Sequence, residues 1–151
     1  MFKPIKIPVS LAFLALLLFM SLTAGGCNVV TGEETDAFSP TTQVYDITVQ
    51  KVFSVIQENA GNPDFIILDV RTPEEYSEGH IEGAINRDYY AQDFENKLNE
   101  LDKAKTYLVY CRTGRRSASV RDIMTDLGFK NIYNMTGGIS DWQSEGYPVV
   151  R

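Results

Sequence analysis

The segment VYCRTGRRS brings together the residue types needed for nucleophilic chemistry on an anion. Cys111 follows an apolar run, and the six residues after it include three arginines and Gly114. The thiolate is the nucleophilic form of cysteine, and nearby cations and N–H groups favour it over the thiol. The segment therefore predicts an anion-binding loop with Cys111 as a nucleophile at its base.

The elements on either side of Cys111 place this loop where ligands bind in a parallel sheet. Residues 106–110 (TYLVY) predict a strand, and residues 115–127 predict a helix with apolar residues on one face. Ligands of open parallel sheets bind beyond the carboxyl ends of the strands. Gly114 suits so tight a turn because glycine readily adopts positive φ. Loop and helix-terminal N–H groups, together with the helix dipole, would then form an anion cradle.

The rest of the chain from residue 44 alternates between strand and helix patterns. The run FIILDV (residues 65–70) is typical of a strand buried on both faces, and Thr72 with Glu75 predicts a capping box at a helix start. Further strands are expected at residues 44–47, 84–86 and 131–135, and further helices after Thr48, at residues 93–101 and around Trp142 in the core. This alternation predicts an α/β fold, a parallel sheet of about five strands with helices on both faces.

Three segments together resemble the rhodanese family of sulfurtransferases. The segment CRTGRRS resembles the active-site loop of that family, and DVRTPEEYSEGHIEGAIN (residues 69–86) resembles its other hallmark segment. The segment GFKNIYNMTGGISDWQSEGYPV matches the family's closing strand, glycine pair and tryptophan-bearing helix. The resemblance runs from about residue 44 to residue 151 and implies a rhodanese-like fold.

The resemblance also implies a reaction and roles for the loop residues. Cys111 would attack the outer sulfur of an anionic donor such as thiosulfate, become a persulfide, and pass that sulfur to cyanide or a thiol. Arg112 and Arg115 would attract the donor, while Arg116 would brace the loop. We expect no cofactor. The residues assigned to this persulfide loop are Arg112, Thr113, Gly114, Arg115, Arg116 and Ser117.

Asp69 and Arg71 are predicted to support the site. They end an apolar strand that runs parallel to the strand before Cys111, so they should lie at the same edge of the sheet. Our hypothesis is that Asp69 makes a hydrogen bond or an ion pair with the loop.

Three other functions compete with sulfur transfer as interpretations of this loop. Cysteine phosphatases carry C-x5-R, but Ser117 occupies that arginine position, and the C-x4-R loop of this chain is a smaller cradle. A binding or persulfide-carrier module that works with a protein partner fits the same loop. Thiol redox chemistry lacks a second cysteine in the fold to resolve an intermediate.

Several remaining residues invite functional assignments. His80 is the only histidine, and we interpret it as structural because attack by a preformed thiolate needs no base. Tyr89 and Tyr90 could contact substrate or pack. For Asp69 and Glu74 no cluster at ligand spacing supports a metal site, so no metal is expected.

The amino terminus predicts export. Residues 1–26 have the pattern of a signal peptide, and LTAGGC resembles a bacterial lipobox, in which Cys27 would be lipidated. The alternatives are a plain cleaved signal and an uncleaved anchor. Residues 27–42 then form a tether and residues 43–151 the domain, held outside the cytoplasm at a membrane. Removing residues 1–26 leaves 12 basic and 20 acidic residues, a net charge of −8, which disfavours nucleic acid as a partner.

Overall fold

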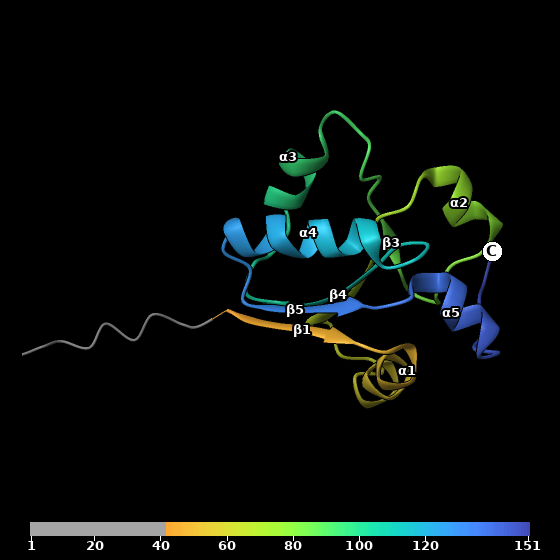
Figure 1. Cartoon of the computed structure of the whole chain (residues 1–151). Helices are drawn as coiled ribbons and strands as arrows, with labels where there is room; N and C mark the ends of the chain where they lie inside the picture. The colour runs from red at the N-terminus through yellow and green to blue at the C-terminus, as the bar shows by residue number, and fades with distance from the viewer. Residues whose placement is uncertain (1–41) are drawn as a thin grey trace, which may run out of the picture. The chain divides into compact units, whose positions relative to one another are not determined.

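The computed structural model describes residues 42–151, which form a five-stranded parallel sheet in the order β1-β5-β4-β2-β3 (Figure 1). The strands are β1 (Gln43–Ile47), β2 (Phe65–Asp69), β3 (Ile85–Asn86), β4 (Thr106–Tyr110) and β5 (Asn131–Met135). The helices are α1 (Val49–Glu58), α2 (Pro73–Glu78), α3 (Phe94–Asn99), α4 (Arg115–Asp126) and α5 (Gly138–Ser144). Every predicted strand and helix from residue 44 onward is present, and the predicted α/β class is confirmed.

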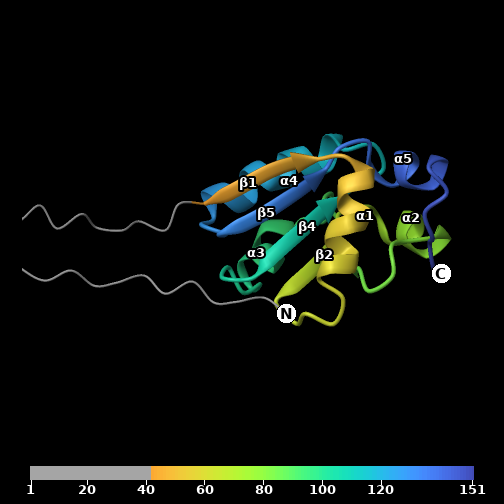
Figure 2. The same ribbon diagram turned by 90° about the horizontal axis from the view of Figure 1, so that it is seen from below.

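Helices cover both faces of the sheet, as Figures 1 and 2 show. On one face, Val120 and Met124 of α4 and Leu98 of α3 pack with apolar strand residues into one core cluster. On the other face, Val52 of α1 and Trp142 of α5 belong to a second cluster. Because both clusters bury side chains from β2 and β4, these central strands are held rigidly between the helical layers.

Two predicted helix starts have the expected caps. The Thr48 hydroxyl accepts a hydrogen bond from the backbone N–H of Lys51, which starts α1. Thr72 and Glu75 form the reciprocal capping box of α2, with Pro73 in the first turn. The capping box fixes where α2 begins, and therefore how the chain leaves the carboxyl end of β2.

The parallel register brings three strand ends together. Asp69 of β2 lies opposite Tyr110 of β4, and Val109 lies opposite Asn134 of β5. The chain segments that follow β2, β4 and β5 therefore start at the same edge of the sheet. Cys111 is the first residue beyond β4 at this edge.

The predicted export signal, the predicted lipidation site at Cys27 and nearly all of the predicted tether lie outside the described residues. Within residues 42–151, no helix combines the length and the apolar character needed to cross a membrane.

Candidate active site

Cys111 lies at the base of a loop that turns from β4 into α4. Its side chain is only 1% exposed and belongs to the core cluster beneath α4. Gly114 has a φ of 90° and caps the amino end of α4, as the turn argument predicted. The loop therefore folds back over the sulfur atom, and α4 starts at Arg115 directly beside it.

Hydrogen bonds from the loop determine the protonation of Cys111. Burial raises the pKa of the Cys111 thiol. The backbone N–H and the hydroxyl of Ser117 oppose this effect, as do the N–H groups of Thr113 and Gly114. These hydrogen bonds outweigh burial, so the pKa of Cys111 lies below its ordinary value. The site favours the thiolate through directed donors, in line with the predicted cradle.

The Ser117 side chain has two acceptors within reach. It is fully buried, and its hydroxyl lies 3.1 Å from the carbonyl oxygen of Gly114 while also contacting the Cys111 sulfur. A hydroxyl carries one proton, so it can donate to only one of these acceptors at a time.

The first turn of α5 holds the back of the loop. The N–H of Ile139 donates to the carbonyl oxygen of Cys111 at 2.9 Å, and the N–H of Ser140 donates to that of Arg112 at 3.0 Å. Gly138, with a φ of 62°, makes this approach possible: a Cβ built on it would lie 2.5 Å from the carbonyl oxygens of Cys111 and Arg112. The glycine pair of the closing segment thus lets one backbone dock directly on another.

Arg116 is tied to α2 and does not point into open solvent. Its guanidinium donates to both carboxylate oxygens of Glu75 at 2.8 Å each. It also lies over the ring of Tyr90, 5.6 Å from the ring centroid. The expectation that Arg116 braces the loop agrees with this geometry, because the contacts join α4, α2 and the loop before α3.

Arg112 and Arg115 are exposed at the mouth of the loop. Within residues 42–151, neither guanidinium forms an ion pair or a side-chain hydrogen bond, so both charges are available to an anion. A hollow of about 370 Å³ opens here, lined by Glu75, Tyr90, Arg112, Thr113, Arg115 and Arg116. Another hollow of about 350 Å³, between α1 and Trp142, shares no lining residue with the loop.

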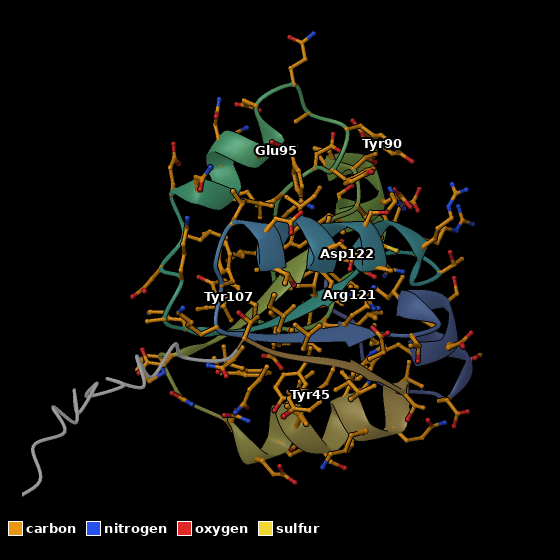
Figure 3. The ribbon with its side chains drawn as sticks, turned by 60° about the vertical axis from the view of Figure 1, so that its left-hand side comes forward. Tyr45, Tyr90, Glu95, Tyr107, Arg121 and Asp122 are labelled. Carbon is orange, nitrogen blue, oxygen red and sulfur yellow. The ribbon has the colours of Figure 1, made fainter. Side chains whose placement is uncertain are left out.

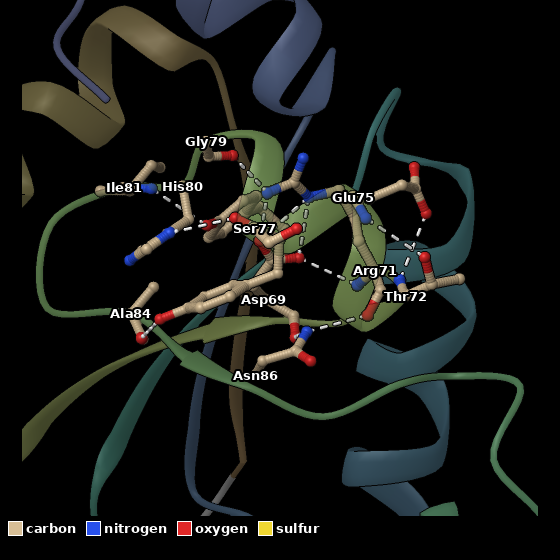
Figure 4. A network of polar contacts seen from close by, with 12 residues as sticks. Asp69, Arg71, Thr72, Glu75, Ser77, Gly79, His80, Ile81, Ala84 and Asn86 are labelled. Atoms are coloured by element: carbon tan, nitrogen blue, oxygen red, sulfur yellow. Dashed lines mark hydrogen bonds and ion pairs between the residues drawn. The ribbon is translucent and has the colours of Figure 1, made fainter. Parts of the chain in front are cut away.

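The hypothesis that Asp69 contacts the loop is wrong. The carboxylate of Asp69 is fully buried and accepts its side-chain hydrogen bonds from Arg71, with the shortest at 2.6 Å (Figure 4). Arg71 also donates to the carbonyl oxygen of Gly79 at 2.7 Å. The pair lies at the predicted edge of the sheet, but the carboxylate of Asp69 is bound by Arg71, which is only two residues further along the chain. Because Arg71 also binds the carbonyl oxygen of Gly79, the Asp69–Arg71 pair links β2 to the carboxyl end of α2.

His80 packs against Tyr76 and makes no hydrogen bond to the loop. Its ring stacks on that of Tyr76 with centroids 3.7 Å apart, and its Nδ1 atom lies 3.1 Å from the Tyr76 carbonyl oxygen. Its backbone bridges to Val150. Tyr89 packs edge-on against Phe94. Within residues 42–151, no cluster of three or more His, Cys, Asp or Glu side chains is arranged to hold a metal ion.

Sequence reasoning missed two residues that hold the site together. The sequence pattern predicts only a capping role for Glu75, yet its carboxylate is also the partner of Arg116. The pattern likewise marks Gly138 only as one of a glycine pair. A second partner for Glu75 could have been expected, because a carboxylate that accepts one hydrogen bond from a capped N–H can still accept hydrogen bonds from further donors.

Comparisons with known proteins agree with this geometry. The family model for the rhodanese-like domain matches residues 53–145. A protein of Schizosaccharomyces pombe, provisionally named as a mitochondrial thiosulfate sulfurtransferase, is 33% identical over 74% of this chain and 88% of its own. A sulfurtransferase of Allochromatium vinosum is 30% identical over 64% of this chain and 89% of its own.

A solved structure supports the same assignment. The crystal structure of a rhodanese-related protein from Thermoplasma volcanium superposes with a TM-score of 0.61 and 33% identity, over 70% of this chain and 97% of the other. The region that the family model matches, residues 53–145, contains the loop, its supporting helices and the whole of β2, β4 and β5. This chain therefore belongs to the family of rhodanese-like domains.

Proposed function

We propose that this chain is a sulfurtransferase that moves a sulfane sulfur from an anionic donor to a thiophilic acceptor through a persulfide on Cys111. The observation that carries the proposal is the set of N–H groups directed at the buried Cys111 sulfur from Thr113, Gly114 and Ser117. Such donors stabilise a thiolate before reaction and a persulfide anion after it.

The proposed reaction with thiosulfate has two steps. The Cys111 thiolate attacks the outer sulfur of thiosulfate, a new S–S bond forms, and the S–S bond of the donor breaks with its electron pair leaving on sulfite. Cyanide or a thiolate then attacks the outer sulfur of the persulfide, giving thiocyanate or a new persulfide and returning the Cys111 thiolate. No base, cofactor or outside oxidant is needed for either step.

The charges at the mouth support an anionic donor. Arg112 and Arg115 have no carboxylate partner within residues 42–151, whereas the charges of Arg71 and Arg116 are balanced by Asp69 and Glu75. Two uncompensated guanidinium groups beside the nucleophile attract a dianion such as thiosulfate and offset the repulsion between it and the thiolate.

The same arrangement is poorly suited to phosphoryl transfer. The position that carries the phosphate-gripping arginine in a C-x5-R loop is Ser117, which is fully buried. The nearest arginine, Arg116, is bound to Glu75 through both of its terminal nitrogens. No guanidinium is left at that place to clamp a transferred phosphate.

Steady-state turnover tests the proposal. Thiocyanate formation from thiosulfate and cyanide should be abolished in Cys111→Ser, and Arg115→Ala should raise the KM for thiosulfate. Arg121→Ala is the matched control, because Arg121 lies on the same helix but pairs with Asp46. If the folded wild type forms no thiocyanate, turnover with thiosulfate is excluded, and another donor or a binding or carrier role with a protein partner takes its place.

We also propose, from the amino-terminal sequence alone, that the domain is held outside the cytoplasm by a lipid on Cys27. Labelled palmitate should enter the wild-type chain and should be absent from Cys27→Ser. Equal labelling of the two chains would contradict the anchor and leave the sulfur chemistry untouched.

A further inference from the structure

The hollow between α1 and Trp142 has the size and the lining of a site for a small organic molecule. It lies on the face of the sheet that α1 and α5 cover and has a volume of about 350 Å³. A mainly apolar lining and a volume above about 300 Å³ are typical of such sites. The apolar side chains around it include Phe53, Ile56, Phe65, Ile81, Trp142 and Pro148.

The walls of this hollow are held by contacts of their own. The ring of Phe53 packs against that of Trp142 with centroids 6.0 Å apart, and the indole N–H of Trp142 donates to the carbonyl oxygen of Pro148 at 2.9 Å. Another wall is a tight turn over residues 81–84, closed by a hydrogen bond of 3.0 Å from the N–H of Ala84 to the carbonyl oxygen of Ile81. Because these groups are already ordered, a ligand would lose little free energy in ordering them.

The charges around the hollow are negative. Glu82, in the tight turn, is the only charged residue that lines it, and its carboxylate forms no ion pair within residues 42–151. Ile56 and Gln57 of the last turn of α1 form a further part of the lining. The carboxyl end of a helix carries partial negative charge, and the last turn of α1 contains no basic residue to offset it. The free carboxylate and the helix end therefore both favour a cation at this place.

We propose that this hollow is a binding site for a small organic molecule in which an apolar ring is joined to one ammonium group. The ring occupies the apolar space beside Phe53 and Trp142, and the ammonium group lies at the rim beside Glu82 and the end of α1. A carboxylate in the place of the ammonium group would be repelled by Glu82, and a neutral hydroxyl would gain little from its charge. The site is separate from the Cys111 loop, so the proposal does not depend on sulfur transfer.

Tryptophan fluorescence tests the site directly, because Trp142 is the only tryptophan of the chain and lines the hollow. Three probes separate the two parts of the ligand. Phenethylammonium has both the ring and the cation, phenethyl alcohol has the ring alone, and methylammonium has the cation alone. Phenethylammonium should bind about two- to tenfold more tightly than phenethyl alcohol. Methylammonium should leave the fluorescence unchanged at the same concentrations.

A charge-removing substitution locates the cation. Glu82→Gln should remove most of the preference for phenethylammonium and leave the binding of phenethyl alcohol unchanged. Glu95→Gln is the matched control and should keep the wild-type preference, because Glu95 lies on α3, across the sheet from α1 (Figure 3).

Several results would overturn the site. They are no response to phenethylammonium, equal binding of the two phenyl probes, tighter binding of phenylacetate, and a preference that persists in full in Glu82→Gln. A dimer in sedimentation that excludes all the probes would likewise assign the hollow to a second copy of the chain. None of these readings involves Cys111, so a failure of sulfur transfer leaves the test intact.

Discussion

Replacing Gly138 by alanine should damage both stability and the active-site loop. The new Cβ would lie 2.5 Å from the carbonyl oxygens of Cys111 and Arg112, which is closer than real contacts of this kind. The backbones must separate, and the hydrogen bonds from Ile139 and Ser140 to those oxygens must lengthen. The persulfide loop then loses the support behind it.

The expected magnitude has two parts. A residue other than glycine at a φ of 62° costs about 1–2 kcal/mol. The two displaced hydrogen bonds each contribute about 0.5–1.5 kcal/mol. Gly138→Ala should therefore lower the free energy of unfolding by about 2–5 kcal/mol. Gly128 has a φ of 85°, and no atom lies within 4 Å of the place that an added methyl group would take, so Gly128→Ala should cost only the backbone part, about 1–2 kcal/mol.

Urea unfolding of the wild type and the two variants measures this difference, and thiocyanate formation measures its effect on the loop. Gly138→Ala should be the less stable variant and should lose activity by more than about tenfold, while Gly128→Ala should keep its activity at temperatures where it is folded. If the two variants were equally stable and equally active, close contact between α5 and the loop would have no energetic importance, and the reasoning would be refuted.

Three further substitutions test individual contacts. Ser117→Ala removes a donor to the Cys111 sulfur, so the rate of iodoacetamide alkylation should reach its plateau at a higher pH than in the wild type; an unchanged profile would contradict the assigned hydrogen bond. Asp69→Asn leaves a buried guanidinium without its counter-charge and should cost about 3–5 kcal/mol in urea unfolding, whereas a loss near zero would show that the pair is dispensable. The hydrogen bonds from Arg116 lower the pKa of Glu75 in the folded protein. The ionised carboxylate therefore stabilises the fold at pH values above the unfolded-state pKa of about 4.3, and this stabilisation is lost as the pH falls through the folded-state pKa. Glu75→Gln should therefore cost up to about 1 kcal/mol at pH 7 and progressively less in acid, and a loss independent of pH would argue against the ion pair.

The sequence allowed the elements to be predicted because their signals are local. Apolar runs gave the central strands, and Thr48 and Thr72 marked the helix starts, since a capping side chain acts within a few residues. The order β1-β5-β4-β2-β3 was not predicted. It depends on which strands pair across long crossovers, and no local pattern in a single chain encodes that choice.

The same distinction applies to the site. The position of Cys111 and the positive φ of Gly114 followed from a strand, a turn and a helix that are adjacent in the sequence. The partner of Arg116 lies 41 residues away, and the α5 amides that hold the loop come from another crossover. The hypothesis for Asp69 failed because the register places a residue at a sheet edge but does not say which of several nearby donors it binds.

Intact-protein mass spectrometry of the purified chain after treatment with thiosulfate tests the central claim most directly. The account predicts that the wild type gains one sulfur atom, that cyanide removes it with release of thiocyanate, and that Cys111→Ser gains none. Failure of the folded wild type to gain sulfur from thiosulfate, or an equal gain in Cys111→Ser, would contradict a persulfide on Cys111.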